Sequence, residues 1–485
     1  MPGFSNESRN LTMMTDLYQL TMMYGYFRHG MGENQAVFDL FYRKAGDTIA
    51  HALAAGLEQV IEYIEHIHFA EVDIQYLRSL NLFDESFLKY LGELKFTGSI
   101  DAAPEGTLVF PGEPIVRVTA PLMQAQLIET SILNIINHQT LIATKASRVV
   151  QAAQGGGVLE FGLRRAQGPD AGIYGARAAI IGGCVATSNV LTGMIYNVPA
   201  RGTHAHSWVM SFPSELEAFR AYARVFPDNC LLLVDTYDTL NSGVPNAIQV
   251  FRELRERGYE GTGIRLDSGD LAYLSRASRK MLDAAGFPSV KIFASGDLDE
   301  EVIWDLKAQG AEIDVWGVGT KLITSAGTTA LGGVYKLAAE EVDGVMEPRL
   351  KISENPAKIT NPGVKTVYRV YDNATGRALA DLIALADEHY DENEPLTLFD
   401  PDHTWKRMTV SNYRLRELLV PIFKNGELVY KCPTLYEIQE YAKTELASLW
   451  EEYKRLHMPH VYKVDLSQKL WDLKQGLLNR HRAGK

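Results

Sequence analysis

Between residues 155 and 320 the sequence repeats one pattern: a short apolar run, then a small or acidic residue, then an amphipathic segment of helical period. Strands and helices that alternate through short loops form a parallel sheet, and a region of this size favours a barrel over a doubly wound sheet. The predicted strands are Gly157 to Phe161, Cys230 to Asp235, Gly263 to Asp267, Val290 to Ala294 and Asp314 to Val318. The predicted helices include Ser214 to Val225, Asn246 to Arg257, Leu271 to Ala285 and Leu298 to Gln309. We therefore expect a parallel α/β barrel over residues 141–345, with a doubly wound sheet as the alternative.

The segments on either side of this region have a different pattern. Apolar residues at steps of three and four predict a helix from Met13 to Phe27, and the alternation of Ala36 to Phe41 predicts a strand. Leu122 to Ala153 has few charges and predicts one or two buried helices. We expect an N-terminal α+β domain over residues 1–140 and a mixed, loop-rich and helical C-terminal segment over residues 346–485. The C-terminal helices are predicted at Tyr441 to Leu456 and Leu466 to Asn479.

The composition excludes several classes of protein. A hydrophobic fraction of 46% with 22% charged residues is that of an ordinary globular protein, and 485 residues are enough for two or three domains. A net charge of −12 without a basic run argues against nucleic acid as a partner. No apolar run is long enough to span a membrane, and Met1 to Asn10 lacks the basic start and apolar centre of a secretory signal. We expect a cytoplasmic protein with no membrane partner.

Cysteines suggest no structural framework. Cys184, Cys230 and Cys432 are far apart and form no Cys-x-x-Cys pair. Neither disulfides nor a cysteine-based zinc site is therefore indicated.

The predicted strands end in residues suited to a sugar phosphate. Glycines at Ser295-Gly296 and from Gly317 to Thr320 let backbone N–H groups approach a phosphate. Asp235 and Asp267 would repel a phosphate unless they face a ribose hydroxyl or a metal ion. A ribose that carries phosphate explains both kinds of residue. Asp270 and Asp297 are predicted to cap the helices that follow them.

Arginines carry the opposite charge at two of these strand ends. Arg164 and Arg165 lie in the loop from Phe161 to Asp170, where two arginines between glycines suggest anion capture. Arg265, inside a strand, needs an anionic partner because a buried arginine without one is not tolerated.

The stretch from Gly202 to Trp208 contains two histidines among small residues. Imidazole is nucleophilic at neutral pH, and the Thr203 hydroxyl could donate a hydrogen bond to a phosphoryl oxygen. Two histidines among small residues are more often ordinary loop residues. A chemical role for this stretch is therefore supported only by the strand-end residues on either side of it.

Five blocks in register resemble the nicotinate phosphoribosyltransferase family. They are Thr15-Asp16-Leu17-Tyr18-Gln19-Leu20-Thr21-Met22, the loop from Phe161 to Asp170, Gly202-Thr203-x-Ala205-His206-Ser207, Gly263-Ile264-Arg265-Leu266-Asp267-Ser268-Gly269-Asp270, and Gly317-Val318-Gly319-Thr320-Lys321. The resemblance implies an irregular α/β barrel and an ATP-hydrolysing ligase that makes nicotinate mononucleotide and diphosphate from nicotinate and 5-phosphoribosyl 1-diphosphate. It implies Mg²⁺, a role in NAD biosynthesis and a homodimer, but it locates no metal ligand.

The resemblance also implies residue roles. His206 matches the histidine that is phosphorylated in the family, whereas His204 occupies a variable position. Tyr18 is implied to stack on nicotinate from the neighbouring subunit. Together with the strand-end residues, the expected catalytic residues are His206, Asp235 and Asp267. The expected substrate-binding residues are Tyr18, Phe161, Arg164, Thr203, Arg265, Ser295, Gly296, Gly317, Gly319 and Thr320.

Three alternatives remain at the level of the sequence. One is a relative specific for nicotinamide, but a cationic lining suits a carboxylate better than an amide. Another is a sugar-phosphate aldolase or isomerase, which normally needs a strand-end lysine or a paired acid and base. The third is a nucleotide-binding protein without catalysis.

Overall fold

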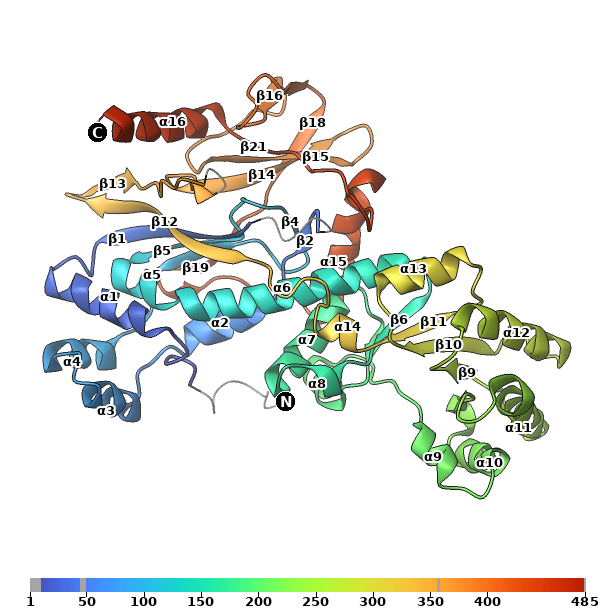
Figure 1. The fold of residues 1–485 in the computed structure, drawn as a ribbon. Helices are drawn as coiled ribbons and strands as arrows, with labels where there is room; N and C mark the ends of the chain where they lie inside the picture. The colour runs from blue at the N-terminus through green and yellow to red at the C-terminus, as the bar shows by residue number, and fades with distance from the viewer. Residues whose placement is uncertain (1–9, 44–48, 356–357, 484–485) are drawn as a thin grey trace. The chain divides into compact units, whose positions relative to one another are not determined.

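Residues 142–329 form a compact unit around one six-stranded sheet, in which the strand order is β7-β6-β11-β10-β9-β8 (Figure 1). The structure is a computed structural model and describes residues 10–43, 49–355 and 358–483. The strands are β6 (Gly157–Glu160), β7 (Ala186–Thr187), β8 (Leu231–Leu233), β9 (Gly263–Leu266), β10 (Lys291–Gly296) and β11 (Val315–Val318). All five pairings are parallel, which confirms the predicted α/β class. Within the described residues β7 and β8 do not pair, so the barrel is irregular and open between them.

Helices connect these strands as the alternation predicts. They are α7 (Pro169–Ile181), α8 (Val190–Tyr196), α9 (His206–Met210), α10 (Glu215–Val225), α11 (Val244–Glu256), α12 (Leu271–Ala284), α13 (Glu300–Ala308) and α14 (Thr320–Ile323). Asp270 caps α12, as expected, because its side chain accepts a hydrogen bond from the backbone of Tyr273. The expected cap at Asp297 is wrong: α13 begins later, and Asp299 accepts from the backbone of Val302 instead.

The second compact unit combines residues 1–141 with residues 330–485. Its seven-stranded sheet has the order β13-β12-β1-β5-β3-β19-β20. These strands are β1 (Gln35–Tyr42), β3 (Ser99–Ala102), β5 (Val116–Pro121), β12 (Gly333–Val342), β13 (Val345–Pro348), β19 (Val420–Lys424) and β20 (Glu427–Leu428). N-terminal and C-terminal segments therefore share one sheet. The division of the chain into three domains stays a prediction.

Helices and smaller sheets complete this unit. A four-stranded sheet contains β14 (Lys365–Asp372), β15 (Ala378–Leu385), β18 (Tyr413–Glu417) and β21 (Val464–Leu466), and two pairs contain β2 (Ala52–Leu53) with β4 (Leu108–Val109) and β16 (Leu396–Phe399) with β17 (Arg407–Val410). The helices are α1 (Leu17–Arg28), α2 (Leu57–Glu65), α3 (Glu71–Ser79), α4 (Glu85–Glu93), α5 (Leu122–Leu127), α15 (Leu435–Ser448) and α16 (Gln468–Ala483). Helix α6 (Glu129–Ala152) begins in this unit and ends in the unit of residues 142–329. The predicted run from Leu122 to Ala153 is thus two helices, whereas α1 begins four residues later than Met13.

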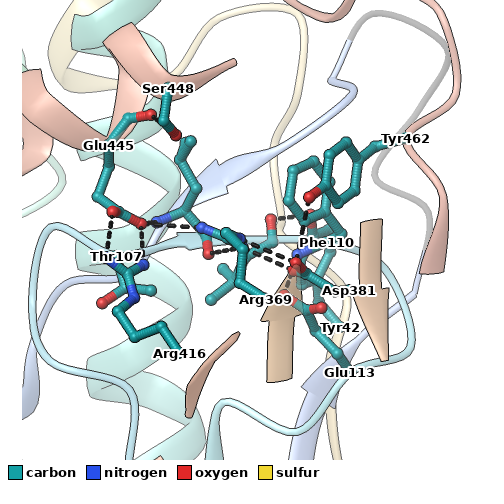
Figure 2. Close-up of polar contacts among 12 residues, drawn as sticks. Tyr42, Thr107, Phe110, Glu113, Arg369, Asp381, Arg416, Glu445, Ser448 and Tyr462 are labelled. Atoms are coloured by element: carbon teal, nitrogen blue, oxygen red, sulfur yellow. Dashed lines mark hydrogen bonds and ion pairs between the residues drawn. The ribbon is translucent and has the colours of Figure 1, made fainter. Parts of the chain in front are cut away.

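A buried polar network joins the two segments of this unit (Figure 2). The Arg369 guanidinium is fully buried and donates to Asp381 through two nitrogens, at 2.8 and 2.6 Å. It also donates to Glu445 and to the backbone carbonyl of Leu108, each at 2.8 Å. A buried guanidinium is tolerated only when its donors are satisfied in this way, so the network ties β4 to β14, β15 and α15.

No helix in the described part of the chain is long and apolar enough to cross a membrane. The expectation that the chain has no secretory signal is based on Met1 to Asn10. Residues 1–9 of this segment lie outside the described residues.

Candidate active site

The ends of four parallel strands bring the predicted site residues to one edge of the six-stranded sheet. The neighbours β8, β9, β10 and β11 run in the same direction, with Leu233 opposite Arg265 and Ser295 opposite Gly317. In a parallel sheet the loops after the strands therefore meet at the carboxyl edge. Sequence segments up to roughly a hundred residues apart form one polar cluster there.

His206 lies between the two predicted carboxylates. Its Nε2 atom is 3.9 Å from Asp235 Oδ1 and 3.9 Å from Asp267 Oδ2. Its Nδ1 atom is 3.1 Å from the hydroxyl of Thr236, and its side chain is 38% exposed. The Nε2 distances are too long for hydrogen bonds, so this nitrogen faces both acids without bonding to either of them.

The two acids differ in their surroundings. Asp235 is buried, and its Oδ2 atom accepts hydrogen bonds from the backbone N–H of Asp267 at 2.8 Å and the hydroxyl of Ser268 at 2.7 Å. Its Oδ1 atom is buried without a hydrogen-bond partner and faces His206. Burial alone would raise the pKa of Asp267, but the hydrogen bond from Ser295 and the charge of Arg265 lower it below the usual value. Asp267 is therefore ionised at neutral pH.

Arg265 meets its expected anionic partner within the chain. Its Nη2 atom donates to Asp267 at 3.2 Å and its Nε to the Ser295 hydroxyl at 2.9 Å. The Ser295 hydroxyl in turn donates a short hydrogen bond to the same Asp267 oxygen. A weaker contact of 3.4 Å joins Nη1 to the carbonyl of His204. These contacts use three of the five guanidinium N–H groups, so one donor on each Nη nitrogen is available for a bound anion.

The second histidine of the stretch has a structural environment. His204 is buried, and its Nε2 atom accepts a hydrogen bond from the backbone N–H of Leu233 at 3.3 Å. Burial lowers the pKa of His204 to about 4, so the ring is neutral. Thr203 donates its hydroxyl proton to the carbonyl of Leu231 at 2.6 Å. Its hydroxyl would have to exchange this bond before it could donate to a substrate.

Phe161 closely approaches Gly317 of β11 and Gly319, which precedes α14. A Cβ atom on Gly317 would lie 2.6 Å from the Phe161 ring, and one on Gly319 would lie 3.1 Å from the Phe161 carbonyl. Only glycine permits this packing without a shift of the ring. The loop then turns through a short 3₁₀ helix, Leu163–Arg165, where Arg164 is exposed. Among the described residues Arg164 has no ion-pair partner.

The remaining predicted residues lie where their segments place them. Ser295 is buried, and Gly296 ends β10 with a φ of +122° that favours glycine. Thr320 begins α14, which has only four residues, so it offers backbone N–H groups but little helix dipole. Tyr18 lies in the other compact unit, on α1, with 47% exposure. Its role stays a prediction.

Sequence reasoning missed four polar residues of this cluster. Thr236 and Ser268 contact His206 and Asp235 directly, and Glu160 and Thr187 hydrogen-bond each other at the end of β6. The first two follow predicted strand-end acids by one residue, which is a usable signal. Glu160 stood inside an apolar run, and the two-residue β7 gave no pattern.

No cluster of three or more histidine, cysteine or acidic side chains with metal-binding geometry occurs in the described ranges.

Comparisons with known proteins identify the family of the chain. Sequence models of the nicotinate phosphoribosyltransferase N-terminal domain, family and C-terminal domain match residues 13–137, 157–375 and 364–474. The chain is 51% identical over 472 residues to the nicotinate phosphoribosyltransferase of Bacillus subtilis (strain 168), which covers 97% of this chain and 96% of the relative. It is 35% identical to the Homo sapiens nicotinate phosphoribosyltransferase over 529 residues, 97% of each chain.

Solved structures give the same result. The crystal structure of human nicotinic acid phosphoribosyltransferase superposes with a TM-score of 0.85 at 34% identity and covers 96% of this chain and 99% of the human one. The crystal structure of a nicotinate-nucleotide pyrophosphorylase from Pyrococcus furiosus shares the fold, with a TM-score of 0.70 at 23% identity. The match covers 91% of this chain and 97% of the Pyrococcus chain. The chain therefore belongs to the nicotinate phosphoribosyltransferase family.

Proposed function

We propose that this protein, a nicotinate phosphoribosyltransferase of NAD biosynthesis, couples ATP hydrolysis to the synthesis of nicotinate mononucleotide and diphosphate by phosphorylating His206. The observation that carries the proposal is the position of His206 Nε2, which is 3.9 Å from each of two carboxylates. Neither an aldolase nor a passive binding protein needs a nucleophilic nitrogen there.

The hydrogen bond on the other ring nitrogen prepares Nε2 for attack. When Nδ1 carries the proton and donates to Thr236, at 3.1 Å, the lone pair of a neutral imidazole lies on Nε2. This nitrogen attacks the γ-phosphorus of ATP, an N–P bond forms, the bond from phosphorus to the β-phosphate oxygen breaks, and ADP leaves. Water later attacks the same phosphorus, which releases phosphate and restores the imidazole.

A phosphoryl group on Nε2 would carry negative charge beside Asp235 and Asp267. The negative charges of the phosphoryl group and the two carboxylates repel each other, so the phosphohistidine has a high free energy. Its hydrolysis is therefore favourable once a cation that neutralises the phosphoryl group has left. The unpartnered Oδ1 of buried Asp235 fits a magnesium ligand, because Mg²⁺ binds through one or two carboxylates and the oxygens of substrate phosphates. When bound, Mg²⁺ neutralises diphosphate and phosphoryl charge.

The phosphoribose transfer uses the same strand ends. The pyridine nitrogen of nicotinate attacks the anomeric carbon, the bond to diphosphate breaks, and positive charge develops on the ribose ring. Asp235 and Asp267 stabilise that charge. The 5-phosphate accepts hydrogen bonds from the backbone N–H groups of the two Gly-containing segments, which are Ser295-Gly296 and Gly317 to Thr320.

Nicotinate lies at the cationic side of the cluster. Arg265 and Arg164 bind its carboxylate, with Thr203 beside them, and Phe161 lies along the ring. Tyr18 stacks on the pyridine ring from a second subunit, which makes the active unit a homodimer. Leu17, Tyr18 and Met22 support this arrangement, because these exposed side chains present an apolar face on α1.

The experiment is an assay of the pure protein with labelled nicotinate, 5-phosphoribosyl 1-diphosphate and Mg²⁺, with and without ATP. The proposal predicts labelled nicotinate mononucleotide in both cases and a faster reaction with ATP. Parallel reactions with labelled nicotinamide should give far less product, because an amide forms no ion pair with arginine. Nucleotide binding without product would favour the non-catalytic alternative.

A further inference from the structure

Glu160 is a buried carboxylate at the end of β6 that no step of the proposed chemistry uses. Its side chain is fully buried, and the described residues place no cation in contact with it. Burial raises the pKa of Glu160, and the hydrogen bonds that it accepts oppose this rise. A buried acid without a cation costs stability, so its presence requires an explanation.

Both carboxylate oxygens are engaged by groups on different segments. Oε1 accepts a short hydrogen bond from the backbone N–H of Gly162, and Oε2 accepts one from the Thr187 hydroxyl at 2.6 Å. Gly162 permits this turn, since a Cβ there would lie 2.5 Å from Ile323 and 2.9 Å from Oε1. The carboxylate therefore closes the turn that directly follows Phe161 and precedes Arg164.

Thr187 connects this turn to the second half of the site. Its hydroxyl accepts from the backbone N–H of Asn189 at 3.0 Å, and its carbonyl accepts from the backbone N–H of Arg201 at 2.9 Å. Arg201 leads into the segment that contains Thr203 and His206. One carboxylate thus links the loop of Phe161 and Arg164 to Thr187, which in turn holds the backbone of Arg201.

We propose that Glu160 is a positioning residue for nicotinate, which holds Phe161 and the Arg164 loop through the turn at Gly162. The inference rests on the proposed role of Phe161 and Arg164 in nicotinate binding. It assigns Glu160 no contact with substrate. The diphosphate is assigned to the acids at the ends of β8 and β9, which do not pair with β6. The 5-phosphate segment Gly317 to Thr320 is closer, because the backbone N–H of Phe161 donates to the Val318 carbonyl at 2.8 Å.

The test compares Glu160→Ala and Glu160→Gln with the matched control Glu215→Ala. Glu215 is also buried and its Oε2 accepts from Asn246 at 2.9 Å and from Ser242, but it belongs to α10. Losing two hydrogen bonds to a charged group should raise the KM for nicotinate of Glu160→Ala on the order of tenfold or more. The KM for 5-phosphoribosyl 1-diphosphate should rise by a clearly smaller factor, because most of its proposed contacts lie at the ends of β8, β9 and β10.

Glu160→Gln should restore most of the nicotinate affinity, because the carboxamide oxygen still accepts from Gly162 and the amide can donate to Thr187. Equal rises in both KM values, or a lowered Tm without a KM change, would overturn the inference. If Glu160→Ala does not fold, Glu160→Asp tests the same idea, since its shorter side chain cannot reach both partners. Arg164→Ala is measured alongside: an unchanged KM for nicotinate in that variant would refute the proposed role of Arg164 in nicotinate binding, on which this inference rests.

Discussion

Replacing Arg265 by alanine tests which substrate the cationic side of the site recognises. The substitution removes the donors to Asp267 at 3.2 Å, to Ser295 at 2.9 Å and to the His204 carbonyl at 3.4 Å. If the guanidinium also meets the nicotinate carboxylate, the loss of one charge-assisted contact costs about 1.5–3 kcal/mol. This corresponds to a rise in the KM for nicotinate of roughly tenfold to a hundredfold.

The same substitution has a second, separable effect. Without Arg265, the pKa of Asp267 should rise toward its usual value, because the arginine's charge and hydrogen bond help to lower it. The acid limb of the pH profile for kcat should then shift to higher pH, since Asp267 must be ionised to stabilise the ribose cation. Arg265→Lys keeps the charge but loses the fork, so its effects should lie between those of the wild type and alanine.

The assay measures the KM for each substrate at saturation with the other, in variants whose circular dichroism and Tm match the wild type. A rise for nicotinate that exceeds the rise for 5-phosphoribosyl 1-diphosphate by about tenfold supports the assignment. An equal loss for both substrates in a folded protein refutes it.

Three further predictions concern other parts of the chain. Mixing Tyr18→Ala protomers with His206→Ala protomers should restore part of the activity, because one site of each mixed dimer would hold both residues; inactive mixed dimers would show that the two act within one chain. Glu113→Gln should flatten the loss of unfolding free energy that occurs as the pH rises from the usual pKa of a glutamate side chain toward the raised pKa of Glu113. Burial and the charge of Asp381 raise that pKa, so over this range the native state keeps a proton that the unfolded chain releases. Denaturant unfolding across this range checks the slope, and an unchanged slope contradicts the assignment. Gly317→Ala should displace the Phe161 ring and raise the KM for nicotinate, as steady-state kinetics would show, and an unaltered KM would mean that the ring does not define the nicotinate site.

The periodic parts of the fold were predictable because their pattern is local. Buried strands such as Leu231–Leu233 are short apolar runs, and α10 carries an apolar stripe bounded by the capping residue Ser214. Helix α7 escaped prediction, since Gly172 and Gly175 lower its helix propensity. The glycines are tolerated because tertiary packing overrides propensity there.

The C-terminal strands were hard to predict for a different reason. Their register depends on partners far away in the sequence: β19 pairs with β3, and Arg369 on β14 needs Glu445 on α15. Turn residues between short strands suggest loops when such partners are not known. Local pattern alone therefore predicted a loop-rich segment.

The candidate site was predictable where residue type and strand end coincide, as for Asp235, Asp267 and Ser295. The distances between them were not, because they depend on the order β8-β9-β10-β11 in the sheet. The hydroxyl of Thr203 shows the limit of residue type as a guide. It donates to the Leu231 carbonyl, a bond that no sequence pattern indicates.

A phosphorylation assay at His206 is the most direct test of the proposed coupling between ATP hydrolysis and phosphoribose transfer. Incubation of the protein with Mg²⁺ and ATP labelled in the γ-phosphate should place an acid-labile, base-stable phosphate on His206. His206→Ala should lose the label and ATP hydrolysis but keep a slower, ATP-independent transfer of phosphoribose, because the ribose and phosphate contacts lie on other loops. Label retained by His206→Ala, or ATP-stimulated turnover at the wild-type rate in that variant, would contradict the assignment of the nucleophile.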